Sequence, residues 1–376
     1  MMNQELIVAL TYTFCLIAVL TYSFLEGLHY YSLGRNKPRR HILLLMLGYA
    51  TLALTYGCAM MRMLSIAWTV HLYLFYLLSL LFSVVLFYHF LWLITRSEST
   101  ERFTWMHYII PVVLTLVVGV WVTHQMSFQE RFRITATVDV LTPETPLIEV
   151  VYMLFPLLFT VYIIIYTVFS VMRAMRYRKM VVDYSSNEER TSMHWLYYYI
   201  VLIAIWSGAP FVLLSYFWAV SQHLYLLMIF LPLCEIILVY NAIRGNYVLV
   251  EETVPLPKGL KLSKQREKPI DRKRFERYMQ EKKPYLNPDL CITDIVPDLY
   301  TNRTYLSTFI NKEYGMNFRT LINNYRLQEL ERIRQLPEYK RFSNMDLIME
   351  VGFGSYRSYL NAERHYHTMM QLPFGT

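Results

Sequence analysis

The first two thirds of the chain contain few charged residues. Residues 1–245 hold 15 Lys and Arg and 12 Asp and Glu, whereas residues 246–376 hold 21 and 16 in a much shorter stretch. Only the second part approaches the charged fraction of roughly 25% found in soluble domains. A water-exposed surface is therefore excluded for most of the first part, and the composition predicts two modules that lie in different solvents.

Cysteine is also scarce. The chain has Cys15, Cys58, Cys234 and Cys291, with no CxxC pair and no nearby His at the spacing of metal ligands. This pattern argues against a structural zinc site and against a disulfide framework. Nothing in the sequence suggests hydrolysis, phosphoryl transfer or redox chemistry, so we expect neither an enzyme nor a bound cofactor or metal.

Seven apolar stretches are long enough to cross a lipid bilayer. A helical crossing needs about 20 residues, and in lipid a helix satisfies its backbone hydrogen bonds internally. The predicted spans cover approximately residues 5–28, 42–61, 66–94, 107–124, 147–172, 195–218 and 223–243. The fourth begins near Pro111, which a helix tolerates at its entrance. We therefore assign residues 1–245 to a seven-helix transmembrane domain.

The loops between these stretches differ in basic residues. Eleven Lys and Arg residues follow the first, third and fifth spans, whereas the alternate loops contain only Arg62, Arg131 and Arg133. The positive-inside rule then places the N-terminus outside and the C-terminus in the cytoplasm. The sequence thus predicts a multi-pass protein of the inner (cytoplasmic) membrane.

Four ionisable residues lie within the spans or near their inner ends. They are Glu26, His29, His89 and Glu235. Because ionisable groups are costly to bury in lipid, we treat them as a candidate sensory polar cluster on the cytoplasmic side. The alternative is that the first three reach interfacial water and that Glu235 bonds a neighbouring Tyr or Ser. The 32 tyrosines favour an interfacial aromatic belt, with an aromatic ligand pocket as the alternative.

The only sizeable outside loop covers residues 125–146. Apolar and polar residues alternate along 132–140, which predicts a half-buried strand that caps the bundle. Further along the chain, Pro255, Pro257, Gly259 and Pro269 mark a juxtamembrane linker at residues 246–270. Residues 258–283 contain eleven Lys and Arg against four Asp and Glu. Such a segment fits attraction to anionic lipid and equally fits neutralisation of DNA phosphates.

Residues 271–376 read as short helices. After a short helix at 292–299, Thr301 or Asn302 caps a second helix at 303–314, and Gly315 stops it. Small polar and cationic side chains on the exposed face of such a helix suit major-groove reading. This face carries Arg303, Thr304, Ser307, Thr308, Asn311 and Lys312, with Asn302 at its start. A long amphipathic helix at 318–336 follows, and then a second short pair at 344–350 and 355–365.

These residues resemble the AraC/XylS family of transcription regulators. The similarity in the first half lies in Asn302-Arg303-Thr304-Tyr305-Leu306-Ser307, Gly315-Met316-Asn317-Phe318, Asn323 and Tyr325-Arg326-Leu327. In the second half it lies in Glu350-Val351-Gly352-Phe353, Ser355 and Ser358-Tyr359. The resemblance implies an AraC-type double helix-turn-helix domain at residues 271–376. Together with the seven predicted spans, it gives an all-α chain in which a seven-transmembrane helix bundle precedes this domain. It also implies that a long central helix holds two recognition helices in successive major grooves of double-stranded DNA.

The resemblance adds candidate DNA contacts in the second unit. They are Ser355, Tyr356, Arg357, Ser358, Asn361 and Arg364. The sequence departs from the family at Thr308 and Asn361, where Arg is usual, and at Glu363, where an aromatic residue is usual. Residues 284–376 carry ten Lys and Arg and ten Asp and Glu, a net charge of zero. We therefore expect the first unit to read bases and the second to pack or to contact the DNA backbone.

Three functions fit this pattern. The leading hypothesis is a membrane-anchored transcription regulator whose partners are DNA, the lipid bilayer and a second copy in a homodimer, controlled by an unidentified signal sensed in the bundle. The second is a seven-helix receptor whose degenerate helix-turn-helix domain binds a protein partner or anionic lipid. The third is a transporter or membrane enzyme with a helical tail, which the lack of a catalytic constellation argues against.

Overall fold

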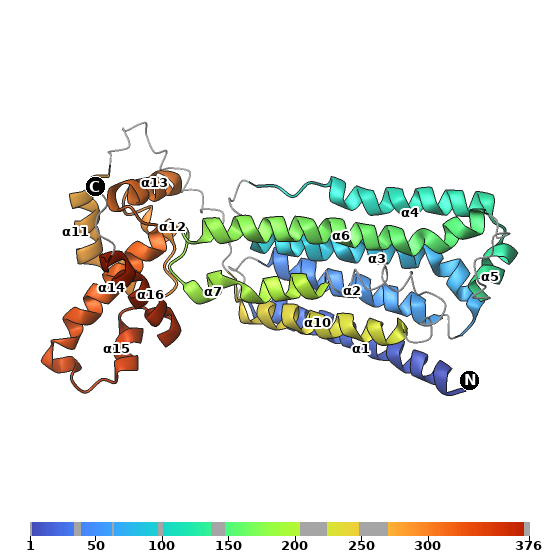
Figure 1. Ribbon diagram of the computed structural model, residues 1–376, viewed down its shortest axis with the longest axis horizontal. Coiled ribbons are helices and arrows are strands. Elements are labelled where there is room, and N and C mark those ends of the chain that lie inside the picture. Colours follow the sequence, from blue (N-terminus) through green and yellow to red (C-terminus); the bar gives the residue numbers. More distant parts are fainter. Residues whose placement is uncertain are drawn as a thin grey trace. The chain divides into compact units, whose positions relative to one another are not determined.

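The computed structural model describes residues 2–33, 39–61, 64–96, 101–136, 147–203, 224–247 and 270–371. These residues form helices and no named strand, which confirms the all-α class for this part of the chain (Figure 1). They divide into two compact units. The first comprises Met1–Arg96, Glu101–Ala174 and His194–Gly245, and the second Ser97–Thr100, Met175–Met193 and Asn246–Thr376.

The first unit is built from long apolar helices. They are α1 (Met2–Ser32), α2 (Arg40–Met60), α3 (Ile66–Ile94), α4 (Met106–Gln125), the short α5 (Phe128–Ala136), most of α6 (Leu147–Val181), a helix at His194–Ile203, and α10 (Leu224–Arg244). Four described helices are long and apolar enough to span a membrane: Ala9–Ser32, α2, α3 and α4. The other three predicted spans stay predictions, and residues 204–218 of the sixth lie outside the described part.

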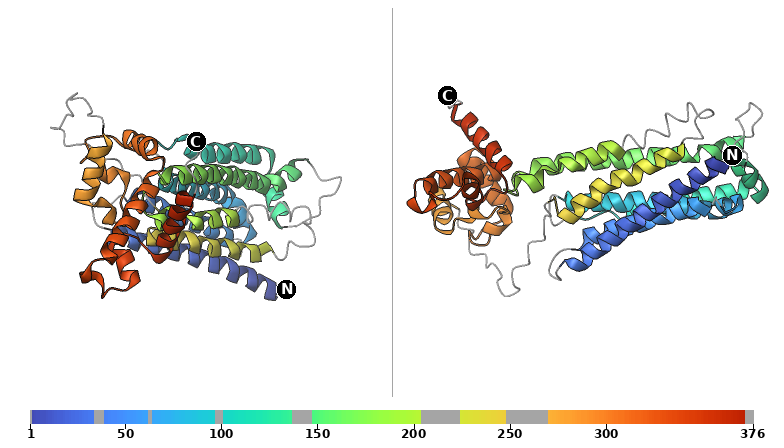
Figure 2. Two further views of the ribbon diagram at one scale, coloured as in Figure 1. Left: turned by 60° about the vertical axis from the view of Figure 1, so that its left-hand side comes forward. Right: turned by 90° about the horizontal axis from the view of Figure 1, so that it is seen from below.

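The long helices of this unit run side by side (Figure 1, Figure 2). α2 packs between α1 and α3, α10 packs against α1, and α3 also contacts α4 and α5. The outer surface remains apolar, since Leu10, Leu116 and Val120 are each more than half exposed. Apolar patches of this kind are unfavourable in water and suit a lipid environment.

Two expectations for the first unit need correction. Residues 132–136 belong to α5, so the predicted strand is wrong there, while 137–140 lie outside the described residues. Ser127 and Glu130 form a capping box, in which the Ser127 N–H donates to Glu130 at 2.7 Å and the Glu130 N–H to Ser127 Oγ at 3.2 Å. This capping box favours the start of a helix at this point and outweighs the alternation of apolar and polar residues. In addition, α4 begins about one turn before Pro111, which therefore lies inside the helix.

The second unit consists of shorter helices that follow the predicted order. They are α7 (Glu188–Ser192), α11 (Arg272–Lys282), η3 (Pro284–Leu286), α12 (Ile292–Ile295), α13 (Arg303–Tyr314), α14 (Phe318–Arg334), η4 (Pro337–Tyr339), α15 (Asn344–Glu350) and α16 (Tyr356–Gln371). The first short helix ends four residues earlier than expected. The predicted basic linker lies almost entirely outside the described residues.

α14 joins two small hydrophobic cores. Its N-terminal half contributes Phe318, Leu321 and Ile322 to a core shared with α11, α12 and α13. Its C-terminal half contributes Leu330 and Ile333 to a separate core shared with α15 and α16. One amphipathic helix thus holds two helix pairs at a defined separation, because each pair buries its apolar side against a different half of α14.

Gly352 brings the backbone of the second pair against η3. Its φ is +94°, a conformation that residues with a side chain rarely adopt. A Cβ atom at this position would lie 2.5 Å from the carbonyl oxygen of Tyr285 and 2.7 Å from that of Leu286. Only glycine allows this approach, so the Val351-Gly352-Phe353 turn is a packing feature of the domain.

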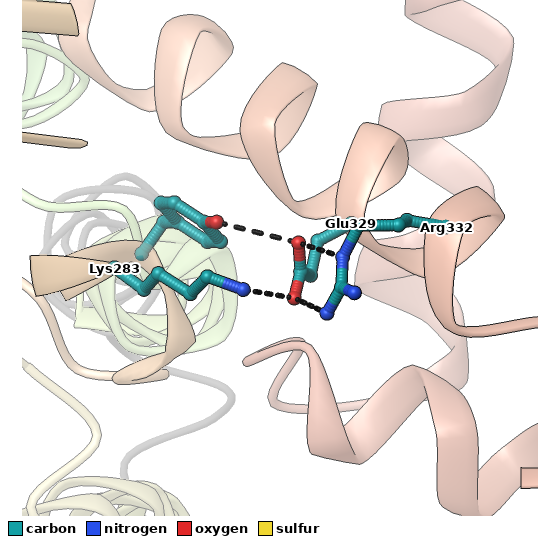
Figure 3. Close-up of polar contacts among 4 residues, drawn as sticks. Lys283, Glu329 and Arg332 are labelled. Atoms are coloured by element: carbon teal, nitrogen blue, oxygen red, sulfur yellow. Dashed lines mark hydrogen bonds and ion pairs between the residues drawn. The ribbon is translucent and has the colours of Figure 1, made fainter. Parts of the chain in front are cut away.

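Glu329, near the middle of α14, joins η3 to the long helix (Figure 3). Its carboxylate accepts hydrogen bonds from Arg332 at 2.7 and 3.0 Å and from Lys283 at 2.8 Å, and the Tyr285 hydroxyl lies 3.5 Å away. The hydrogen bonds from Arg332, followed by those from Lys283, lower the pKa of Glu329 to about 2, although burial opposes them. The ionised carboxylate is thus stabilised in the folded domain.

We predict that the backbone amides of α14 lose protection against hydrogen exchange as the pH falls from 4.5 to about 2. Because the pKa of Glu329 is depressed below its ordinary value of 4.5, its contribution is complete above that value and disappears as the pH approaches 2. Solvent screens the exposed Arg332 side chain, so the ionised Glu329 carboxylate contributes about 1–2 kcal/mol to the free energy of unfolding. Hydrogen-exchange mass spectrometry of the α14 peptides measures it.

The Glu329→Gln variant is the reference for this measurement, because it removes the ionisation and retains the size. We expect it to be less protected than the native protein at pH 6 and equally protected near pH 2. Equal protection of the two proteins at every pH would contradict the assignment.

Candidate nucleic-acid interface

The start and end of α13 are determined by its own sequence. The Asn302 side chain accepts a hydrogen bond from the Tyr305 N–H at 2.8 Å and caps the helix. Gly315 ends the helix in the left-handed conformation, with φ of +65°. Buried Leu306, Phe309 and Ile310 hold one side of α13 in the first core. The opposite side is thereby directed to the surface.

The exposed side of α13 carries most of the predicted reading residues. Thr304, Thr308, Asn311 and Lys312 are exposed, whereas Ser307 and Arg303 are half-buried. The Thr308 hydroxyl donates to the carbonyl oxygen of Thr304 within the helix, at 2.9 Å. The structure therefore presents four small polar or cationic side chains on the surface of α13, as base reading requires.

A segment distant in sequence completes the first core. Residues 182–191, hereafter the 182–191 segment, follow α6 and pack within the second unit. The Ile292 N–H donates to the Tyr184 carbonyl at 2.8 Å, the Ser186 N–H donates to the Leu290 carbonyl at 3.0 Å, and Ser185 pairs with Cys291 in an antiparallel bridge. Tyr184 is buried in the first core. The segment is thus part of this domain.

Two arginines of α14 secure the segment. The Arg319 side chain donates to the Ser185 carbonyl at 3.2 Å and to the Thr191 hydroxyl. Arg326 is 2% exposed and donates to the hydroxyl of Ser186 at 3.0 Å. It also donates to the carbonyl oxygens of Tyr285 and Asn287, each at 2.8 Å. Neither arginine was expected to contact a loop between two membrane spans, because no local pattern signals such a long-range contact.

The 182–191 segment also reaches three predicted reading residues. Its Tyr184 ring lies 5.1 Å below the Arg303 guanidinium. Its Asp183 carboxylate lies beside Asn311, and burial raises the pKa of Asp183 more than the hydrogen bonds from Asn311 and the Phe318 N–H lower it. Each of these contacts falls on the N-terminal unit of the predicted DNA-binding domain.

The third predicted DNA contact that the 182–191 segment reaches is Asn361 on α16, in the second helix pair. The Asn361 side chain donates to Glu188 of the segment at 2.9 Å. Acidic residues of one short segment therefore adjoin polar side chains of both α13 and α16. Polar contacts of α13 and α16 with DNA would need these same donors.

The candidate contacts on α16 differ in accessibility. Tyr356, Arg357 and Arg364 are exposed. Ser355 caps the helix through a reciprocal pair of hydrogen bonds with Ser358, each 3.2 Å long. Ser358 is 7% exposed, and its hydroxyl donates to the Ser355 carbonyl at 2.7 Å. Ser358 is therefore a buried capping residue, and its role as a DNA contact stays a prediction.

The departure from the family at position 363 has a local explanation. The Tyr359 hydroxyl donates to the Glu363 carboxylate one turn later on α16. Tyr359 is itself buried in the second core beside Phe353, with ring centroids 5.7 Å apart. Glu363 is thus satisfied by a tyrosine partner at the edge of this core.

α11 supplies the positive charge that residues 284–376 lack. Its Lys273, Arg277 and Lys282 are exposed. The helix packs against α13 through Phe275, whose ring lies 5.7 Å from that of Phe309, and Arg272 lies 5.0 Å from the Tyr314 ring. The basic side chains of α11 therefore flank the proposed reading helix.

The candidate sensory residues fall into three separate polar groups. Glu26 and His29 lie 3.5 Å apart on α1. The Nδ1 atom of His89 instead lies 2.7 Å from the Tyr108 hydroxyl. The His89 ring stacks on that of Phe103, with ring centroids 3.8 Å apart. Glu235 accepts hydrogen bonds from tyrosines, as the alternative interpretation predicted. The described residues therefore do not form one four-residue contact network.

Comparisons with protein-family models, with curated proteins and with solved structures found no match for this chain. The likeness to AraC/XylS regulators therefore stays an expectation from the motif residues of the sequence.

Proposed function

We propose that this protein is a membrane-anchored transcription regulator that binds double-stranded DNA through residues 271–371. The observation that carries the proposal is the pair of cores on α14. Each core supports a short helix followed by a helix with an exposed polar side, α13 and α16 respectively. Two such helices on one connecting helix suit entry into successive major grooves.

The charge distribution supports unequal roles for the two helix pairs. α13 is flanked by the basic side chains of α11, which can neutralise DNA phosphates. α16 offers two exposed arginines, Arg357 and Arg364, and one partly exposed amide, Asn361. We therefore assign base reading to Thr304, Thr308, Asn311 and Lys312, and backbone contacts to the two arginines.

The 182–191 segment provides a means of control. Asp183 and Glu188 are acidic and lie beside Asn311 and Asn361, so they compete with DNA for these two amide donors. The segment follows α6 directly in the chain. α6 belongs largely to the first unit, which holds the long apolar helices and is hereafter called the membrane unit. A signal in the bundle then changes DNA affinity by moving the Asp183 and Glu188 side chains away from these donors or back to them, while Tyr184 and Ser186 stay docked.

The proposal also includes the membrane topology. Four described helices meet the length and hydropathy of membrane spans. We propose that α6, residues 195–218 and α10 supply three more, which places the N-terminus outside the inner membrane and the second unit in the cytoplasm.

A second candidate is a receptor whose C-terminal unit binds a partner protein or anionic lipid. The zero net charge of residues 284–376 favours it. Binding of DNA to the intact protein distinguishes the two functions.

We predict that the intact protein enriches discrete genomic DNA sites after cross-linking in cells. Substitution of two exposed α13 residues, Thr304→Ala with Asn311→Ala, should weaken binding to those sites at least about tenfold, since each base contact contributes about 1–3 kcal/mol. Affinity is measured with the full chain in lipid nanodiscs.

The matched control is Gln328→Ala with Gln335→Ala, two exposed positions on α14. We expect native affinity from it. Absence of any enriched site would exclude the regulator and leave the receptor, whereas equal affinity of both double variants would show that α13 is not the reading helix.

We further predict that Asp183→Asn with Glu188→Gln increases affinity for the same sites several-fold. The change removes two negative charges that adjoin the reading residues and retains the side-chain sizes. The measurement is a binding titration at fixed salt concentration.

Glu189→Gln removes a neighbouring exposed charge and controls for the general effect of charge on DNA binding. An equal gain from Glu189→Gln, or no gain from the double variant, is incompatible with competition by the segment.

A further inference from the structure

A cavity of about 90 Å³ lies inside the membrane unit. Residues of α2, α3, α6, the helix at His194–Ile203 and α10 line it. The lining is mainly aliphatic and aromatic and includes Phe87, Tyr88, Tyr166 and Ile203. An apolar cavity of about 150 Å³ accommodates benzene. The space inside the bundle therefore suits a smaller organic molecule with a short apolar body.

One carboxylate, that of Glu235, borders this cavity. The residue is 2% exposed. Its two oxygens accept hydrogen bonds from the hydroxyls of Tyr49 and Tyr199, both at 3.0 Å. Since each carboxylate oxygen accepts about two hydrogen bonds, room for further donors remains. A buried carboxylate held only by neutral donors lacks the countercharge that such groups usually have.

The described ion pairs of this unit leave Glu235 without a cation. They join His29 to Glu26 and Arg173 to Glu101. Ser83 and Ser170 also line the cavity, but their hydroxyls donate to carbonyl oxygens of their own helices and not to Glu235. A positively charged ligand would supply what the described side chains do not.

The chemistry of the lining decides which cation fits. The described residues contain no group of three or more His, Cys, Asp or Glu that could hold a metal ion, and hard metal ions need six or more oxygen ligands. A protonated amine needs one carboxylate, and aromatic faces such as those of Tyr88 and Tyr166 attract it. The methylene groups of such a ligand would bury against the aliphatic lining.

We propose that this cavity is a binding site for a small primary ammonium compound, with its charged group on Glu235 and its short apolar body among the aromatic side chains. The site is independent of whether the second unit binds DNA. A ligand of about three heavy atoms limits the affinity to roughly the millimolar range.

The test uses the full-length protein in lipid nanodiscs and ethylammonium chloride as the probe. Thermal unfolding is measured over a millimolar range of the probe, because a ligand that binds only the folded state raises the midpoint temperature with concentration. We expect a saturable increase with ethylammonium and none with ethanol, which has a similar size and no charge.

Glu235→Gln should weaken the binding of ethylammonium at least about tenfold. The matched control is Glu26→Gln, since Glu26 is a buried carboxyl in the same unit and does not appear in the cavity lining. This variant should retain the native response.

A second variant, Ser83→Leu, narrows the cavity and keeps the carboxylate, so it tests the site even if Glu235→Gln folds poorly. We expect it to abolish the response. The proposal is overturned by an equal effect of ethanol, by a native response in Glu235→Gln or Ser83→Leu, or by no response of the native protein to ethylammonium.

Discussion

The second unit depends on the hydrogen bonds of one buried guanidinium. Arg326 binds a hydroxyl of the 182–191 segment, two carbonyl oxygens of η3 and its flank, and the Asn323 side chain, while the Phe353 ring lies 5.7 Å away. Burial lowers the pKa of Arg326 to about 10, so the group remains charged at neutral pH. Loss of any partner would leave a buried charge incompletely satisfied, which costs several kcal/mol. Each of these segments is therefore required for the stability of the others.

This constraint gives the loop after α6 a structural role in the domain that we propose reads DNA. The boundary between the two units falls within α6, so one helix belongs to both. The chain then passes through the 182–191 segment, which contacts Arg303, Asn311 and Asn361, before it returns to the membrane unit at His194. If the bundle binds an ammonium ligand at Glu235, no separate signalling module is needed between that site and the residues that we propose contact DNA.

Local sequence signals predicted the helices of the second unit well, because Asn302, Gly315 and Asn317 determine helix ends through contacts with adjacent residues. A signal of the same kind, the Ser127–Glu130 capping box, begins α5 and outweighs the alternation of apolar and polar residues there. The docking of Tyr184 and Ser186 could not be predicted, since it joins residues more than 100 positions apart and leaves no periodic pattern. The partners of Glu235 could be anticipated only as a class, because many tyrosines were available.

The most direct test of this account is a cross-link between the 182–191 segment and the domain. Cys291 is a thiol opposite Ser185 in an antiparallel bridge, where the distance between Cα atoms suits a disulfide. Ser185→Cys in the full chain should form a disulfide with Cys291 under mild oxidation, detected as a linked peptide by mass spectrometry. Glu189→Cys, at an exposed position of α7, should cross-link to Cys291 far more slowly. Equal or slower linkage of Ser185→Cys would show that the segment is not part of the domain.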